Sequence, residues 1–170
     1  MGWTSLQPNI FTGLYLASAV EFVKGWRKGE RGGKLRLMAS RDAPVGIVDA
    51  YDVGVFAARL LSLGDTSGHS GKKYVLNGPE DITGEEIVRL VERHIGAKIE
   101  EERVVYKDLS MVEQVVAAPQ ESKNVMSSLR YSADTAWNGE CTASTTSREV
   151  LEIAPATQTP AEVFSAMLEG

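Results

Sequence analysis

Apolar residues change their spacing several times along the first hundred residues, and this alternation limits the fold more than any other feature of the sequence. Segments with every second residue apolar are typical of strands, and segments with apolar residues every three or four positions are typical of helices. We expect strands over 3–7, 35–39, 45–48 and 73–76, and helices over 11–23, 49–64 and 83–95. Strands and helices in this order, joined by short connections, predict an α/β layer structure with parallel strand pairing.

Two helix starts carry specific capping signals. Thr83 and Glu86 are spaced as a capping box, in which each side chain accepts from the backbone amide of the other residue. Asp49 can cap the helix that follows it, because its carboxylate accepts from free amides of a first turn. Thr159 followed by Pro160 predicts the start of a helix near the end of the chain.

The remaining segments complete the expected domain organisation. Alternating charged residues predict an edge-like strand over 99–106. Weaker helical patterns cover 109–118, 122–137, 147–153 and 160–168. We therefore expect a single domain over 1–170, with a core over 1–106 and a mostly helical, variable tail over 107–170.

Charge and cysteine content exclude several classes of partner. The 170 residues carry 18 Lys and Arg against 23 Asp and Glu, a net charge of −5 without a basic run, so we expect neither nucleic acid nor a membrane surface as partner. The longest apolar stretch, 11–23, is too short and too interrupted for a transmembrane helix. The single cysteine, Cys141, cannot form an intrachain disulfide and lies in a polar segment, which predicts an inert thiol and a cytoplasmic location.

The common cofactor and metal motifs are absent from the sequence. No G-x-G-x-x-G follows a predicted strand, and the glycines between 25 and 33 follow a helix instead of opening one. His69 and His94 are 25 positions apart without other ligand residues around them, so we expect no metal site.

Three blocks of sequence resemble those of a known family. The segment 3–11, W-T-S-L-Q-P-N-I-F, resembles the T-x-L-R-P-N-x-F segment of NmrA-like proteins, which are atypical short-chain dehydrogenases/reductases. The segment 46–54 resembles the helix entry I-x-V-x-D-I-G of the same family, and 71–83 resembles G-K-x-Y-x-L-T-G-P-E-x-L-T. The blocks have the family's order and separation, whereas the tail after Ile99 fits loosely.

This resemblance implies a partial Rossmann-like parallel sheet with its substrate-side helices. The amino-terminal half of that fold, which carries the glycine-rich dinucleotide-binding turn, would lie before Met1. The family implies NADP or NAD as cofactor, although the Tyr-x-x-x-Lys pair of ordinary short-chain dehydrogenases is absent, since no tyrosine has lysine four residues later. We therefore expect this chain by itself to bind dinucleotide weakly, if at all.

The resemblance also assigns candidate site residues. It implies that Pro8, Asn9 and Phe11 form the wall where nicotinamide and substrate meet, although a strand end and helix entry explain the same residues. Tyr15, Asp49 and Tyr51 are the candidates for the substrate pocket. Helix capping is an alternative role for Asp49, and simple packing is an alternative for Tyr51; no residue is assigned as catalytic.

Three functions remain open from the sequence. The first is the substrate-side portion of an NmrA-like NAD(P)-dependent reductase. The second is a non-catalytic module of the same family that binds a small-molecule ligand or regulates, and the third is a cofactor-independent isomerase or cyclase that uses the retained pocket. Because half of a doubly wound sheet exposes an unpaired edge, we expect a homodimer or a partner chain to cover it.

Overall fold

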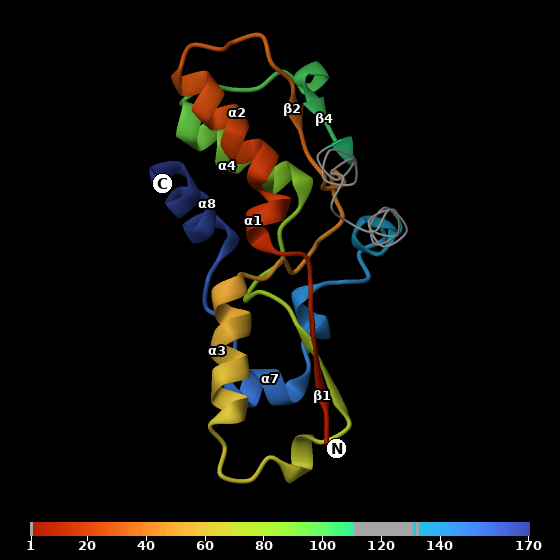
Figure 1. Cartoon of the computed structure of the whole chain (residues 1–170). Helices are drawn as coiled ribbons and strands as arrows, with labels where there is room; N and C mark the ends of the chain where they lie inside the picture. Colours follow the sequence, from red (N-terminus) through yellow and green to blue (C-terminus); the bar gives the residue numbers. More distant parts are fainter. Residues whose placement is uncertain (1, 111–130, 132) are drawn as a thin grey trace, which may run out of the picture.

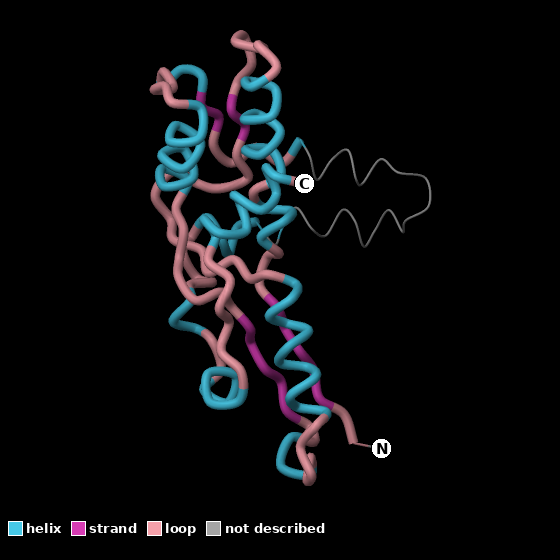
Figure 2. Tube along the Cα trace, turned by 90° about the vertical axis from the view of Figure 1, so that its left-hand side faces the viewer, coloured by secondary structure: helices cyan, strands magenta, loops and turns pink. Residues whose placement is uncertain are grey.

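Two short pairs of parallel strands lie toward opposite ends of an elongated molecule (Figure 1 and Figure 2). The computed structural model describes residues 2–110, 131 and 133–170. Strand β1 (Thr4–Pro8) pairs with β3 (Lys72–Leu76), and β2 (Leu35–Arg36) pairs with β4 (Val104–Val105). The predicted α/β class with parallel pairing is therefore confirmed.

The two outer edges of the β1–β3 pair differ. On β3, the backbone amide of Ser147 donates to the carbonyl of Val75 at 3.0 Å, and the Ser147 hydroxyl accepts from the amide of Val75 at 2.9 Å. On β1, the amide of Asn9 donates to Leu76 on β3, so the backbone groups of odd-numbered residues face β3. Those of Thr4, Leu6 and Pro8 face the opposite edge, with which no strand of the described residues pairs.

Two helices cover the longer strand pair. Helix α3 (Ala50–Leu61) and the short α7 (Arg148–Ile153) lie beside β1 and β3 in Figure 1. The Asp49 carboxylate accepts from the amide of Tyr51 at 2.8 Å, which confirms the predicted cap of α3. Burial of apolar side chains holds these elements together, in a core made by Phe56, Leu60, Tyr74, Leu76 and Val150.

The other half of the molecule is a layer of helices packed around a larger core. It contains α1 (Thr12–Tyr15), α2 (Ala17–Arg27), α4 (Gly84–Ile95) and α8 (Pro160–Glu169). Helix α2 packs against both α4 and α8. The capping boxes at Thr83 and Thr159 are present, and α4 ends at Gly96 with a φ of 66°, a left-handed conformation that glycine adopts without strain.

Three predicted elements differ from the structure. The helix predicted over 11–23 is divided at Leu16 into α1 and α2, because α1 is a single turn that packs on α8. The charged strand predicted over 99–106 is confirmed only for Val104–Val105, because residues 101–103 form a 3-10 turn in which Glu101 binds Arg41. Segment 45–48 makes isolated bridges only.

The tail prediction is tested over part of its length. Helices α7 and α8 confirm the patterns predicted over 147–153 and 160–168. The predicted helices over 109–118 and 122–137 lie largely outside the described residues, although 133–137 are helical. No helix within the described part of the chain has the length and apolar character needed to cross a membrane.

Candidate functional site

A cavity of about 320 Å³ opens at the carboxyl end of β1. This is the end of a parallel strand at which α/β proteins usually bind their ligands. The three residues predicted to form the cofactor wall come together here, and most of the lining is apolar: Pro8, Asn9, Ile10, Phe11, Leu14, Met38, Leu109, Ala133, Thr135 and Cys141. Phe11 and Leu14 are 41% and 44% exposed and stand at its mouth.

The Asn9 side chain joins four chain segments beneath this cavity. Its amide nitrogen Nδ2 lies 2.8 Å from the carbonyl of Cys141, 2.8 Å from Oδ1 of Asn77 and 3.1 Å from the carbonyl of Gly46. Its Oδ1 accepts from the amide of Ile10 at 2.7 Å. Both polar atoms of Asn9 are therefore used within the protein, and the residue shapes the wall instead of offering a free donor to a ligand.

Asn77 extends this network to the tail. It is 2% exposed, and its Nδ2 donates to the hydroxyls of Thr145 and Thr146, each at 3.0 Å. Two glycines allow the segments to approach: a Cβ on Gly46 would lie 2.6 Å from the amide nitrogen of Ala143, and one on Gly78 would lie 2.1 Å from a backbone carbonyl oxygen. The sequence indicated only a turn at Asn77-Gly78-Pro79, within a family-like block, and not this network.

Tyr15 lies behind the cavity wall instead of in the cavity. It is 2% exposed and lines a much smaller cavity, of about 10 Å³, that shares Leu14 and Met38 with the larger one. Its hydroxyl has no hydrogen-bond partner among the described residues. Burial, together with the nearby Cys141 thiol, raises the pKa of the Tyr15 hydroxyl, so the phenol stays protonated.

The Cys141 thiol borders the main cavity and is also held in its protonated form. Burial raises the pKa of the thiol, and this effect outweighs hydrogen bonds from Asn9 and Thr135 that favour the thiolate. A protonated thiol is a poor nucleophile. Neither Tyr15 nor Cys141 therefore titrates near neutral pH, which limits the acid–base chemistry that these two groups can perform.

The other two predicted pocket residues lie away from the cavity. Asp49 caps α3, and Tyr51 follows it with 67% of its surface exposed. Neither residue lines the cavity at the end of β1. The neighbouring Asp52 is buried and accepts from the backbone amides of Thr157 and Gln158, so it fastens the tail to α3.

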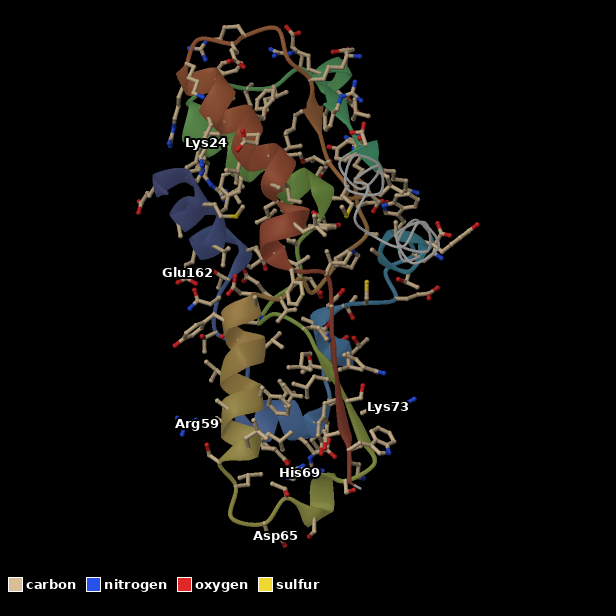
Figure 3. The ribbon with its side chains drawn as sticks, viewed as in Figure 1. Lys24, Arg59, Asp65, His69, Lys73 and Glu162 are labelled. Atoms are coloured by element: carbon tan, nitrogen blue, oxygen red, sulfur yellow. The ribbon has the colours of Figure 1, made fainter. Side chains whose placement is uncertain are left out.

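A second cavity, of about 400 Å³, lies at the amino end of β1. It is bordered by Trp3 and Leu6 from the β1 segment and by Leu61 from α3, and Trp3 and Leu61 are 54% and 81% exposed. His69 also borders it, and its Nδ1 lies 2.6 Å from the Tyr74 hydroxyl. Figure 3 shows His69 and Asp65 at this end of the molecule.

The described residues do not form a complete cofactor or metal site. Glycines with positive φ occur at 29, 71, 96 and 139, and none of the four stands between a strand and the start of an α-helix, where a pyrophosphate is held. In the described ranges, no three His, Cys, Asp or Glu side chains gather to hold a metal ion. The described residues therefore include no glycine turn of the kind that holds the phosphates of a dinucleotide.

Solved structures share this architecture over nearly the whole chain. The NADPH-dependent quinone oxidoreductase of Escherichia coli matches 98% of this chain with a TM-score of 0.60 and 20% identity, over 53% of its own length. The Citrobacter triphenylmethane reductase in complex with NADP(H) matches 99% with a TM-score of 0.61 and 19% identity, over 54% of its length. The chain has the fold of about half of such a reductase. These matches confirm the fold that the resemblance to NmrA-like proteins predicted.

A curated relative matches part of the sequence. The (4-alkanoyl-5-oxo-2,5-dihydrofuran-3-yl)methyl phosphate reductase of Streptomyces griseus is 32% identical over 94 residues, which are 55% of this chain and 29% of the relative. No family model matches the chain. The chain thus spans about half the length of the solved structures and less than a third of this curated relative.

Proposed function

We propose that this chain forms the substrate-side half of an NmrA-like NAD(P)-dependent reductase. The observation that carries the proposal is the apolar cavity at the carboxyl end of β1, where Pro8, Asn9 and Phe11 meet. In this role Pro8 and Phe11 supply the wall between nicotinamide and substrate, and Asn9 fixes that wall through its hydrogen bonds to the neighbouring segments.

The lining of the cavity indicates the class of substrate. Its mostly apolar residues favour a flat, weakly polar molecule, and the burial of such a molecule excludes water from the reacting atoms. The names of the relatives describe reductases of a quinone, a triphenylmethane dye and an oxo-dihydrofuran, all of which are conjugated compounds. We therefore propose a conjugated, mainly apolar acceptor as the substrate.

Binding of NADPH and of duroquinone by the chain tests the proposal. The described residues include no glycine turn that could bind a pyrophosphate. Calorimetry should therefore detect no saturable binding of NADPH by the chain alone below about 1 mM. Duroquinone should bind saturably, as measured by quenching of tryptophan fluorescence. Tight NADPH binding would contradict the assignment to the substrate side, and the absence of quinone binding would contradict the cavity as its site.

Two leucine variants show which cavity takes the quinone. Leu14→Trp places a large side chain in the mouth of the cavity at the end of β1 and should weaken duroquinone binding at least about tenfold, by steric exclusion. Leu61→Trp makes the same change at an exposed leucine of the second cavity and should leave binding unchanged. Equal effects of both variants would refute the assignment to the cavity at the end of β1.

Ligand binding without redox chemistry is the second candidate. It is favoured by the raised pKa values of the Tyr15 hydroxyl and the Cys141 thiol, which leave both groups protonated at neutral pH. The same observation gives no support to the isomerase or cyclase alternative, which needs an acid–base group at the pocket. Because the chain alone is not expected to bind NADPH, oxidation of NADPH by duroquinone, followed by absorbance, would separate a reductase from a binding module in a protein that joins this chain to a dinucleotide-binding half.

A further inference from the structure

We infer that a single water molecule is bound inside the protein, where it bridges the phenol of Tyr15 on α1 and the carboxylate of Asp108. Tyr15 is 2% exposed, and its hydroxyl has no hydrogen-bond partner among the described residues. Buried hydroxyls almost always have a partner, so an unpartnered one on a residue that lines a cavity points to a bound polar molecule. The inference concerns interior residues of this chain and does not depend on the proposed reductase role.

The small cavity that Tyr15 lines has the size and the polar lining that a water needs. Its volume is about 10 Å³, at the lower end of the about 10–15 Å³ that admits one water molecule. A buried water also needs between about two and four polar partners. The polar residues that line the cavity with Tyr15 are Ser18, Arg36, Asp108 and Ser110. The cavity therefore has room and partners for one water and for nothing larger.

The protonation states of the two bridged groups fit a water between them. Burial, together with the nearby Cys141 thiol, raises the pKa of the Tyr15 hydroxyl, so the phenol keeps its proton and can donate a hydrogen bond. Burial also raises the pKa of the Asp108 carboxyl, but hydrogen bonds from Ser110 and Arg36 outweigh this effect and hold the pKa low, so the carboxylate can only accept. A water accepts from the phenol and donates to the carboxylate, and it thereby satisfies both groups.

Asp108 has an acceptor site left for this water. Its Oδ2 accepts from Nη1 of Arg36 at 2.7 Å, and its Oδ1 accepts from the amide of Ser110 at 2.9 Å and from the Ser110 hydroxyl. A carboxylate offers about four lone-pair sites, so these three hydrogen bonds leave one site for a further donor. The positive charge of Arg36 offsets that of the carboxylate, so the cavity favours a neutral molecule over an ion.

The water joins two segments that line the larger cavity at the end of β1. Leu14 belongs to α1, one residue before Tyr15, and Leu109 follows Asp108 directly. Both leucines line the larger cavity. A bridge from Tyr15 to Asp108 fastens α1 to the segment 108–110, so the water helps to hold these two parts of the wall in place.

A high-resolution crystal structure of the chain gives the direct test. A solvent peak should lie about 2.6–3.0 Å from Oη of Tyr15 and at a similar distance from a carboxylate oxygen of Asp108. A direct hydrogen bond from the Tyr15 hydroxyl to a protein group, or the absence of a solvent peak from this cavity, would overturn the inference.

The Tyr15→Phe variant gives a second test, because a bridged phenol and an unpartnered phenol predict changes of opposite sign. Loss of a hydrogen bond to the water should raise the equilibrium constant of unfolding about fivefold, as measured by urea denaturation. Removal of a buried hydroxyl without a partner should instead lower that constant. Tyr51→Phe, at a tyrosine that is 67% exposed, is the matched control and should leave the constant unchanged. A lowered or unchanged constant for Tyr15→Phe would contradict the bound water.

Discussion

Replacement of Asn9 by alanine should destabilise the protein strongly, although the residue lies beside a cavity. The substitution removes the donor that serves the carbonyls of Cys141 and Gly46 and the side chain of Asn77, and the acceptor that serves the amide of Ile10. A buried polar group left without a partner costs about 1–3 kcal/mol. The part-buried setting lets water reach some of these atoms, so we expect a loss of about 2–4 kcal/mol in the free energy of unfolding.

Urea denaturation followed by circular dichroism measures this loss. The midpoint should fall while the slope stays constant, which shows that stability and not compactness has changed. For a chain of this size the same loss corresponds to a decrease in Tm of about 5–15 °C. The exposed Gln7 is the control position, and Gln7→Ala should change stability by less than about 0.5 kcal/mol.

An isosteric variant tests the physical reason. Asn9→Asp keeps the shape but places a carboxylate against carbonyl oxygens, and at pH 7 it should be more destabilising than Asn9→Ala. Burial among acceptors raises the pKa of the introduced carboxyl in the folded state, so the penalty is full above that pKa and shrinks as the pH falls through it. A loss below about 0.5 kcal/mol for both variants would refute the role given to Asn9.

Four further substitutions have defined outcomes. In Gly78→Ala the added Cβ lies 2.1 Å from a carbonyl oxygen, so thermal unfolding should show a loss of about 2 kcal/mol or more in the free energy of unfolding. Gly54→Ala, at an open position of α3, should instead raise that free energy by about 0.5–1 kcal/mol. Thr83→Ala removes a cap and should cost about 1 kcal/mol by urea denaturation. Burial raises the pKa of Glu92, but hydrogen bonds from Lys98 and the Ile99 amide outweigh this effect and hold the pKa low. The ionised Glu92 therefore stabilises the folded state fully above pH 4.5, and this stabilisation is lost as the pH falls through the lowered pKa. Glu92→Gln should accordingly flatten the acid limb of a curve of unfolding free energy against pH.

The helix starts were predictable because their causes are local. Thr83 with Glu86, and Asp49 with Tyr51, make contacts within three residues of sequence, and the structure contains each of them. The division of the first helix at Leu16 was not predictable from its apolar stripe, because packing of α1 on α8 joins residues more than a hundred positions apart. The strand predicted over 99–106 is shorter in the structure for a similar reason, because β2 pairs with only two of its residues, Val104 and Val105.

The grouping of three candidate residues was predictable, whereas the contacts that hold them were not. The resemblance indicated Pro8, Asn9 and Phe11, which the structure brings to one cavity. The network from Asn9 to Asn77 spans 68 positions, and periodicity carries no information on contacts of that separation. The approach of Gly46 to the Ala143 segment could not be predicted for the same reason, although a glycine within a predicted strand is a signal of close backbone approach.

The contact of Ser147 with β3 closes one edge of the longer strand pair to further strands. A strand pair with two open edges is a template from which fibres grow in both directions, as in cross-β assemblies. Here the Ser147 hydroxyl and backbone occupy the amide and carbonyl of Val75, so a chain that arrives at that side finds no ladder to extend. This edge of β3 is therefore protected from strand addition, and Ser147→Ala, which frees the Val75 amide, should raise the hydrogen-exchange rate of that amide.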